Sequence, residues 1–204
     1  MTRRRFEGKT LLVATHNAGK LEEFRQIMGP LGITVTSAAE HALSEPPETE
    51  TTFIGNARIK AHAAARATGL PALADDSGLE VAALNGAPGV YTADWAETPQ
   101  GRDFTMAMER THAELTAINA PQPWDARFCC TLVLAWPDGH DEVFEGHVTG
   151  QLIWPRRGQD GHGYDPMFQP TGETRSFAEM TAAEKNALSH RGAAITALLQ
   201  GCFA

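Results

Sequence analysis

The sequence has few cysteines, and this shortage argues against disulfide-rich and zinc-binding proteins. Only three occur among 204 residues, at positions 129, 130 and 202. Cys129 and Cys130 are neighbours in an apolar run, so in a strand they face opposite sides and do not pair. No Cys or His spacing is typical of a zinc site. We interpret the cysteines as small apolar side chains and expect a protein of the reducing cytoplasm.

Basic residues are also scarce. The 17 Lys and Arg face 25 Asp and Glu, which gives a formal net charge of -8. Binding along a nucleic-acid backbone requires a basic surface, so we expect no nucleic-acid partner. A small anionic substrate remains possible where lysines, arginines or a metal ion offset the repulsion.

Long apolar runs are absent near the start of the sequence. The run after Arg3–Arg5 covers only residues 11–14, too short for a signal-peptide core or a membrane span. We therefore expect no membrane partner, and we interpret Arg3–Arg5 as a solvated start. The length suits one domain or two closely joined lobes.

The spacing of apolar residues predicts helices and strands that alternate in the first half and a hairpin in the second. This order is typical of a mixed α/β sheet. We expect strands at 10–14 and 33–37, helices at 20–28, 53–68 and 104–118, a hairpin of 126–136 and 142–152 around Pro137-Asp138-Gly139, and a last helix that begins at the capping box of Thr181 and Glu184.

The segment Thr15-His-Asn-Ala-Gly-Lys20 connects the first strand to the first helix. Backbone N–H groups at a helix start attract anions, and Lys20 adds a full positive charge. The segment is not a P-loop, because that motif requires Gly at position 14 and Ser or Thr at position 21. These positions hold Ala14 and Leu21. By itself the segment is more typical of an ordinary turn with an exposed lysine than of an anion site.

The second motif, Asp75-Asp76-Ser77-Gly78, is interpreted as an acidic turn between apolar runs. Adjacent carboxylates are costly unless they are neutralised, and Mg²⁺ prefers oxygen ligands of this kind. Glutamates at positions 45, 48 and 50 can supply another ligand. The alternative is a solvated acidic turn.

Two further motifs lie near the C-terminal end. In Gly161-His-Gly-Tyr-Asp-Pro166, His162 or Tyr164 can stack on a nucleobase and Asp165 can accept a hydrogen bond. Lys185 and Ser189-His190-Arg191 can reach one ligand together only if their helix bends or ends near Ser189. The alternatives are a tight loop and a solvated charged helix face.

Together these motifs resemble the inosine triphosphate pyrophosphatase family, the noncanonical purine nucleoside triphosphate pyrophosphatases. The matching stretches follow the family's order and cover nearly the whole chain. They are residues 14–23, 52–57 with Lys60, 73–79, 86–91, 163–168 and 184–191.

The resemblance implies an α/β fold in which an elongated mixed β-sheet with flanking helices forms two lobes around a central substrate cleft. Residues 1–204 would be a single pyrophosphatase domain with these two lobes. The implied reaction is Mg²⁺-dependent hydrolysis of ITP, dITP and XTP between the α and β phosphates, giving a nucleoside monophosphate and pyrophosphate. A homodimer is also implied.

The resemblance also assigns roles to residues at matching positions. Asp76 would be the general base and a metal ligand, Glu48 the second metal ligand, and Ser77 a substrate contact. The other substrate-binding residues would be Thr15, His16, Asn17, Ala18, Gly19, Lys20 and Lys60 at the phosphates, and His162, Gly163, Tyr164, Asp165, Lys185, His190 and Arg191 at the nucleoside.

Two positions depart from the family's pattern. His162 replaces the usual Phe and would stack less strongly, with a ring that titrates. Gly55 replaces the usual Glu, which removes one carboxylate near the expected site. Three alternatives stay open: a pyrophosphatase of the septum-formation-inhibitor type that acts on modified pyrimidine nucleotides, a nucleotide-binding regulator without catalysis, and an acidic scaffold protein with a Mg²⁺ site.

Overall fold

A computed structural model of the protein describes residues 3–204, which form two compact units. The first unit contains the described residues up to Asp76, together with Thr131–Glu145 and Ala194–Ala204. The second contains Ser77–Cys130 and Gly146–Ala193. Three strands, β3, β7 and β8, contribute residues to both units.

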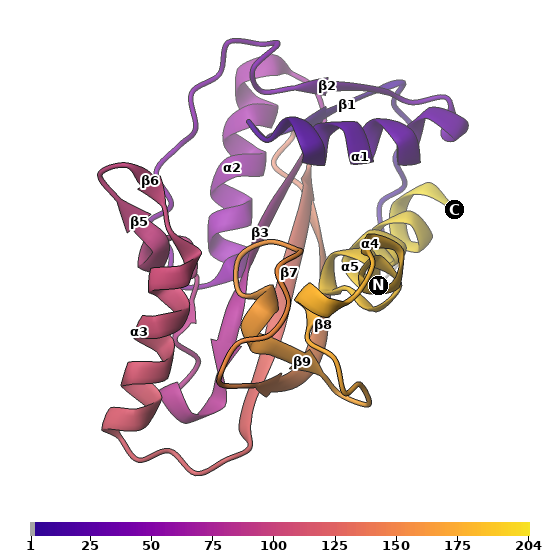
Figure 1. Ribbon diagram of the computed structural model, residues 1–204. Coiled ribbons are helices and arrows are strands. Elements are labelled where there is room, and N and C mark those ends of the chain that lie inside the picture. The colour runs from indigo at the N-terminus through magenta and orange to yellow at the C-terminus, as the bar shows by residue number, and fades with distance from the viewer. Residues whose placement is uncertain (1–2) are drawn as a thin grey trace. The chain divides into compact units, whose positions relative to one another are not determined.

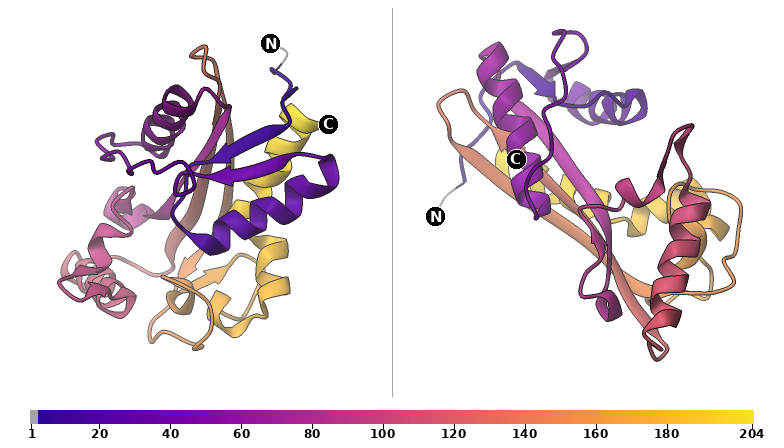
Figure 2. Two further views of the ribbon diagram at one scale, coloured as in Figure 1. Left: turned by 90° about the horizontal axis from the view of Figure 1, so that it is seen from above. Right: turned by 90° about the vertical axis from the view of Figure 1, so that its left-hand side faces the viewer.

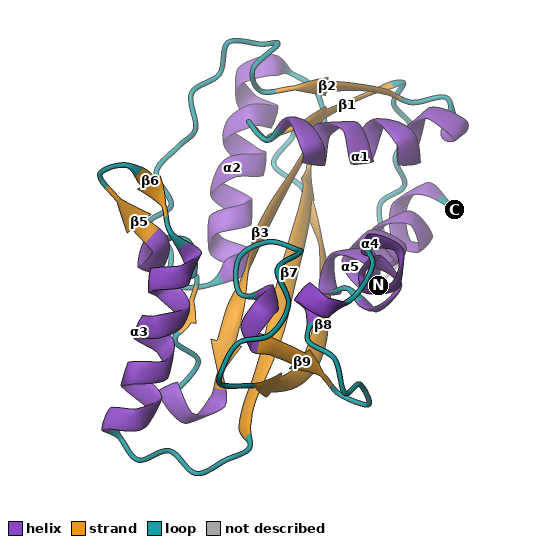
Figure 3. Cartoon of the chain, in the orientation of Figure 1, coloured by secondary structure: helices purple, strands orange, loops and turns teal. Residues whose placement is uncertain are grey.

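The main sheet has seven strands in the order β2-β1-β3-β7-β8-β9, with β4 paired to β3 (Figures 1 and 3). β1 runs parallel to β2 and β3, whereas β4 and β9 pair antiparallel to β3 and β8. The predicted mixed α/β fold class is therefore confirmed. The strands are β1 Thr10–Val13, β2 Thr34–Ser37, β3 Ala72–Val81, β4 Pro88–Gly89, β7 Trp124–Ala135, β8 Asp141–Leu152 and β9 Phe168–Pro170, with a separate pair of β5 Glu97–Thr98 and β6 Gly101–Arg102.

Five α-helices lie between or after these strands. Thr52 caps the start of α2, and Gly69 ends it with a φ of 71°, so α2 has the predicted bounds of 53–68. The expected hairpin is formed by β7 and β8. The helices are α1 Ala18–Met28, α2 Phe53–Thr68, α3 Phe104–Ala117, α4 Ala182–Leu188 and α5 His190–Leu198.

Each unit has its own hydrophobic core. In the first unit, the alanine face of α2 packs with Leu12 of β1 and Val133 of β7. Small side chains allow a helix to approach a sheet closely, so this core holds α2 firmly. In the second unit, aromatic residues dominate: the ring of Phe128 lies 4.6 Å from that of Phe168 and 6.1 Å from that of Phe177.

Arg3 and Arg4 are exposed, as expected for a solvated start, and both also contact the first unit, Arg4 through an ion pair with Asp138. The Arg3 guanidinium lies 4.2 Å from the ring centre of Phe144 and donates to Val143 O. Phe6 N donates to Cys202 O, so the two ends of the chain meet (Figure 2). Cation–π contacts of this kind account for ordered arginines. No helix within residues 3–204 is long and apolar enough to cross a membrane.

Candidate functional site

The segment after β1 forms a capped helix start. Asn17 is the N-cap of α1, and its Oδ1 accepts from Lys20 N at 3.1 Å. The Thr15 hydroxyl accepts from Asn17 N at 3.1 Å. The Lys20 ammonium lies 2.7 Å from Asp75 Oδ2. This arrangement gives an ordered turn with backbone N–H groups and a cation at a helix start, which suits an anion.

Asp75 and Asp76 lie within β3, so our interpretation of 75–78 as a turn is wrong. This segment belongs to the ten-residue strand β3, whose neighbours in the sheet are β1 and β7; the pairing with β1 ends at Leu73, before the two aspartates. Parallel pairing of Val13 with Leu73 brings the two carboxylates next to the end of β1. Adjacent strand residues face opposite sides, which directs Asp75 to Lys20 and Asp76 elsewhere.

Asp76 shares its surroundings with Lys60 and Glu48. Lys60 is buried on α2, and its ammonium lies 2.5 Å from Glu48 Oε1. Burial alone would lower the pKa of Lys60, but Glu48, Asp76 and Asp75 raise it, so this lysine is charged. Burial raises the pKa of Asp76 to about 6, and Glu48 and Asp75 add to the rise while Lys60 opposes it. A carboxyl of this kind can take up a proton near neutral pH.

Asn56 is a member of this cluster that the sequence analysis did not assign. It is 2% exposed and lies one helical turn before Lys60 on the buried face of α2. Its side chain accepts from Glu50 N at 3.0 Å and hydrogen-bonds Asp76. The signal in the sequence was two polar residues, four positions apart, on a helix face that otherwise carries alanine.

The carboxylates of Asp76 and Glu48 fit a magnesium ion that is only partly held by protein. Within residues 3–204, no three His, Cys, Asp or Glu side chains converge in a geometry that holds a metal ion. Mg²⁺ usually takes one or two carboxylates and completes its coordination with waters and substrate phosphates. The oxygen donors next to Lys60 and the helix start match that requirement.

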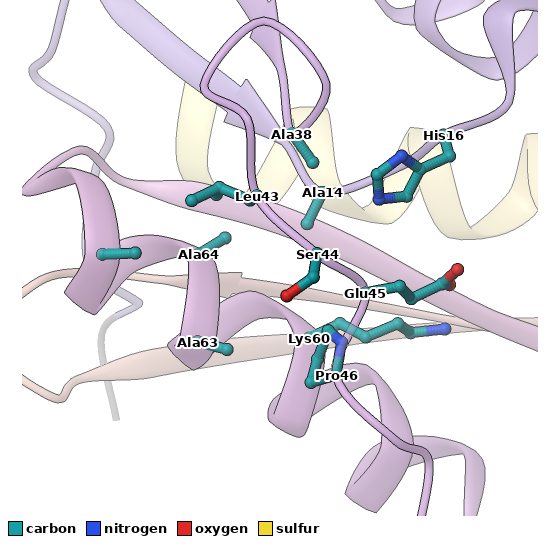
Figure 4. Close-up of a pocket in the computed structure, with 11 residues that line it drawn as sticks. Ala14, His16, Ala38, Leu43, Ser44, Glu45, Pro46, Lys60, Ala63 and Ala64 are labelled. Atoms are coloured by element: carbon teal, nitrogen blue, oxygen red, sulfur yellow. The ribbon is translucent and has the colours of Figure 1, made fainter.

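A cavity of about 250 Å³ adjoins this cluster in the first unit. His16, Glu45 and Lys60 gather at one end of it, and Leu43 and Ala64 lie at the other (Figure 4). His16 and Lys60 both belong to the predicted phosphate-binding set, so the structure places them around one space. Glu45, one of the three candidate glutamates, lines this cavity, whereas Glu48 pairs with Lys60.

In the second unit, Asp165 organises the predicted nucleoside-binding loop. It is 2% exposed, contacts the Lys185 ammonium, and accepts from His162 N at 2.5 Å. Gly163 adopts a φ of 65°, which lets the loop turn tightly between His162 and Asp165. The structure therefore brings together His162, Asp165 and Lys185.

The helix break that the sequence analysis required is present at Ser189. α4 ends at Leu188, Ser189 is extended with φ -75° and ψ 147°, and α5 begins at His190. The ring of His190 stacks on Phe128 at 5.2 Å. On an unbroken helix, His190 and Arg191 would point away from the face that carries Lys185. Because of the break, their side chains are not bound to those directions.

The two rings of the nucleoside-binding loop differ in exposure. Tyr164 is 1% exposed and packs against Phe104 in the core, so its ring supports the loop and only its backbone is left for a ligand. His162 is exposed and lines a second cavity of about 280 Å³, together with Gly163, Arg102 and Phe104. Of the two candidates, only His162 exposes its ring.

Comparison with known proteins decides the family. The family model described as the Ham1 family matches residues 11–201. The chain belongs to the Ham1 family. A dITP/XTP pyrophosphatase of Ruegeria pomeroyi is 64% identical over 200 residues, covering 98% of each chain. Another, from Rhizobium meliloti, is 54% identical over 211 residues, covering 98% of this chain and 99% of the relative.

Solved Ham1 structures share the fold. A HAM1 protein from Coxiella burnetii matches with a TM-score of 0.89 at 35% identity, over 95% of this chain and 98% of that one. A Mycobacterium abscessus protein described as a nucleoside-triphosphatase or dITP/XTP pyrophosphatase matches with a TM-score of 0.81 at 39% identity, over 93% and 98%. The family resemblance of the sequence motifs is confirmed. The assignment of individual site residues, and the substrate cleft, stay predictions.

Proposed function

We propose that this Ham1 chain hydrolyses noncanonical purine nucleoside triphosphates to the monophosphate and pyrophosphate, with Mg²⁺ as cofactor and Asp76 as general base. The enzyme class, a nucleoside triphosphate pyrophosphatase, follows from relatives at 54–64% identity that carry this description. The observation that carries the mechanism is the buried Asp76 carboxyl beside Lys60 and Glu48, with a pKa of about 6.

The first-unit cluster is suited to the phosphate chain. The N–H groups at the start of α1 and the ammonium groups of Lys20 and Lys60 bind phosphate oxygens. Above its pKa, Asp76 accepts a proton from the water that attacks the α phosphate. When bound by Asp76 and Glu48, Mg²⁺ would offset phosphate charge and make that water more acidic.

The second-unit cluster is suited to the nucleoside. His162 offers a flat ring for stacking, and Asp165 and Lys185 offer an acceptor and a donor to the ligand. Discrimination against adenine would rest on the purine 6-oxo edge. A site that donates to O6 and accepts from N1–H leaves groups unpaired against the adenine amino group, at about 1–3 kcal/mol each.

The direct test is to incubate the protein with ITP and Mg²⁺ and to identify the products. We expect IMP and pyrophosphate, and the same reaction with dITP and XTP. Asp76→Asn should abolish turnover in a folded protein, while Asp75→Asn, the same change one residue away, should retain it. Release of IDP and orthophosphate would refute the proposed cleavage, and a near-normal rate for Asp76→Asn would remove the proposed base.

The same substrate panel separates the alternatives. Preference for modified pyrimidine nucleotides would indicate the septum-formation-inhibitor type. Binding of ITP without hydrolysis would indicate a regulator. No effect of any nucleotide on the melting temperature would indicate a scaffold protein.

Location and assembly form a further part of the proposal. None of the three cysteines, all of which lie within the described residues, forms a disulfide, which supports a reducing compartment such as the cytoplasm. The homodimer and the absence of a nucleic-acid partner rest on the family resemblance and the acidic charge. Light scattering of the purified protein tests the dimer.

A further inference from the structure

Helix capping and helix propensity make glycine an unexpected residue at position 55. It is the third residue of α2, and its N–H donates to the Thr52 hydroxyl at 3.1 Å. A glutamate at this position would complete a capping box with Thr52, whereas glycine disfavours a helix relative to alanine. Its backbone is helical, so no left-handed conformation requires glycine. The reason for Gly55 must therefore lie in what surrounds it.

The side chain of Glu50 fills the space that a residue 55 side chain would need. A Cβ built on Gly55 would lie 2.5 Å from Glu50 Cβ, 2.7 Å from Glu50 Cγ and 3.0 Å from the Thr52 hydroxyl. Carbon atoms do not approach this closely. The Glu50 atoms involved are next to the main chain, so a rotation of the far end of the side chain cannot relieve the clash. The Glu50 backbone would have to move.

Glu50 sits in the segment that carries the proposed metal ligand Glu48. Glu50 N donates to Asn56 Oδ1 at 3.0 Å, and Asn56 also hydrogen-bonds Asp76. Two residues upstream, Glu48 pairs with Lys60. The segment between β2 and α2 contains no helix or strand, so these contacts fix it at this end (Figure 3).

We propose that Gly55 is a positioning residue: its missing side chain lets Glu50 lie against the first turn of α2, which holds Glu48 next to Asp76 for Mg²⁺. The inference rests on the proposed function for the role of Glu48, but the packing of Glu50 on Gly55 can be tested without it. It also accounts for Gly55 at a position where a glutamate would favour the helix. The glycine is the partner of Glu50, and the two positions form a coupled pair.

The test is Gly55→Ala, with Gly29→Ala as a matched control. Gly29 also has a helical backbone, with φ -55°, but a Cβ there meets nothing within 4 Å. Without Mg²⁺ or nucleotide, Gly55→Ala should speed amide hydrogen exchange at Glu50 by about tenfold or more, because its bond to Asn56 is lost. By calorimetric titration with MgCl₂ alone, it should weaken Mg²⁺ binding by about tenfold or more. Gly29→Ala should change neither quantity by more than about twofold.

A double variant tests whether the clash with Glu50 causes the loss of Mg²⁺ affinity. Glu50→Gly removes the Glu50 atoms that would clash with a side chain at position 55. The double variant Glu50→Gly/Gly55→Ala should therefore recover most of the Mg²⁺ affinity that Gly55→Ala loses. Independent effects of the two substitutions would simply add and would give no such recovery. In assays with ITP, the loss in Gly55→Ala should appear as a higher Mg²⁺ requirement, with kcat restored at saturating Mg²⁺.

Two results would overturn the inference: unchanged exchange at Glu50 in Gly55→Ala, or a double variant no better than Gly55→Ala. A wild-type protein that fails to hydrolyse ITP would instead refute the proposed function. In that case the exchange measurement still decides the role of Gly55.

Discussion

Replacing Asp76 with asparagine should stabilise the protein when metal and nucleotide are absent. Asp76 is 7% exposed, and burial raises its pKa from 3.8 to about 6. The folded protein therefore holds this proton more tightly than the unfolded chain does. Between these two pH values the folded state binds more protons, so stability contributed by this group falls as pH rises.

The size of the effect follows from the two pKa values. Above pH 6 the difference corresponds to about 3 kcal/mol of unfavourable free energy for the charged carboxylate. Asparagine has nearly the same shape as a protonated aspartic acid and keeps a polar partner for Asn56. We expect Asp76→Asn to raise the free energy of unfolding by about 1–3 kcal/mol at pH 8 and by almost nothing at pH 4. For a chain of this length, that is about 2–12 °C in Tm.

The assay is thermal and urea unfolding of wild type and Asp76→Asn across pH 4–8, with Asp75→Asn as control. Asp75 pairs with Lys20 at 2.7 Å, so its replacement should lower stability slightly or leave it unchanged. Adding Mg²⁺ should raise the Tm of wild type more than that of Asp76→Asn, because the cation relieves the same buried charge. A stability gain that does not vary with pH, or a loss at pH 8, would refute the reasoning.

Three further outcomes follow from the site geometry. Lys20→Ala should raise KM for ITP by about tenfold in steady-state kinetics, because the ammonium serves the phosphates, and should lower Tm, because the largely buried Asp75 loses its ion pair with Lys20. Asp165→Asn should lower the free energy of unfolding by about 1–3 kcal/mol in urea titrations, because it weakens the bonds from Lys185 and His162. Thr181→Ala should cost about 1 kcal/mol in the same titration and raise KM, because the cap of the helix that carries Lys185 is lost.

Much of the fold was predictable because the local signals agreed with the tertiary structure. Helix α2 was predicted at residues 53–68 and occupies Phe53–Thr68, since its alanine spacing and Gly69 point to the same boundaries. The capping box at Thr181 likewise marks the start of α4. Agreement of this kind between propensity and packing is typical of natural sequences.

Asp75 and Asp76 were wrongly predicted to form a turn, because here the local signals disagree with the tertiary structure. Asp75 and Asp76 have low strand propensity, and a sequence window gives no information on the strands that flank them. In the structure, both residues lie within the ten-residue strand β3, which neighbours β7 in the central sheet. The roles of Asn56 and Gly55 were beyond prediction for a related reason, because they depend on Glu50, which reaches the first turn of α2 only once the segment after β2 has folded.

Asp75 and Asp76 are neighbours in β3, so their side chains lie on opposite faces of the strand and contact different residues. Lys20 pairs with Asp75 and Lys60 with Glu48, and Asp76 lies close to both Lys60 and Glu48, so three carboxylates share two ammonium groups. Burial, with additions from Glu48 and Asp75, raises the pKa of Asp76, so the charged form of this carboxyl destabilises the free protein. A triphosphate would bring still more negative charge to the same place, which two lysines already paired with carboxylates cannot offset. A divalent cation would balance the charge of the Asp76 carboxylate and that of the triphosphate. The unfavourable free energy of the charged Asp76 without a cation is the physical reason to expect a cation here.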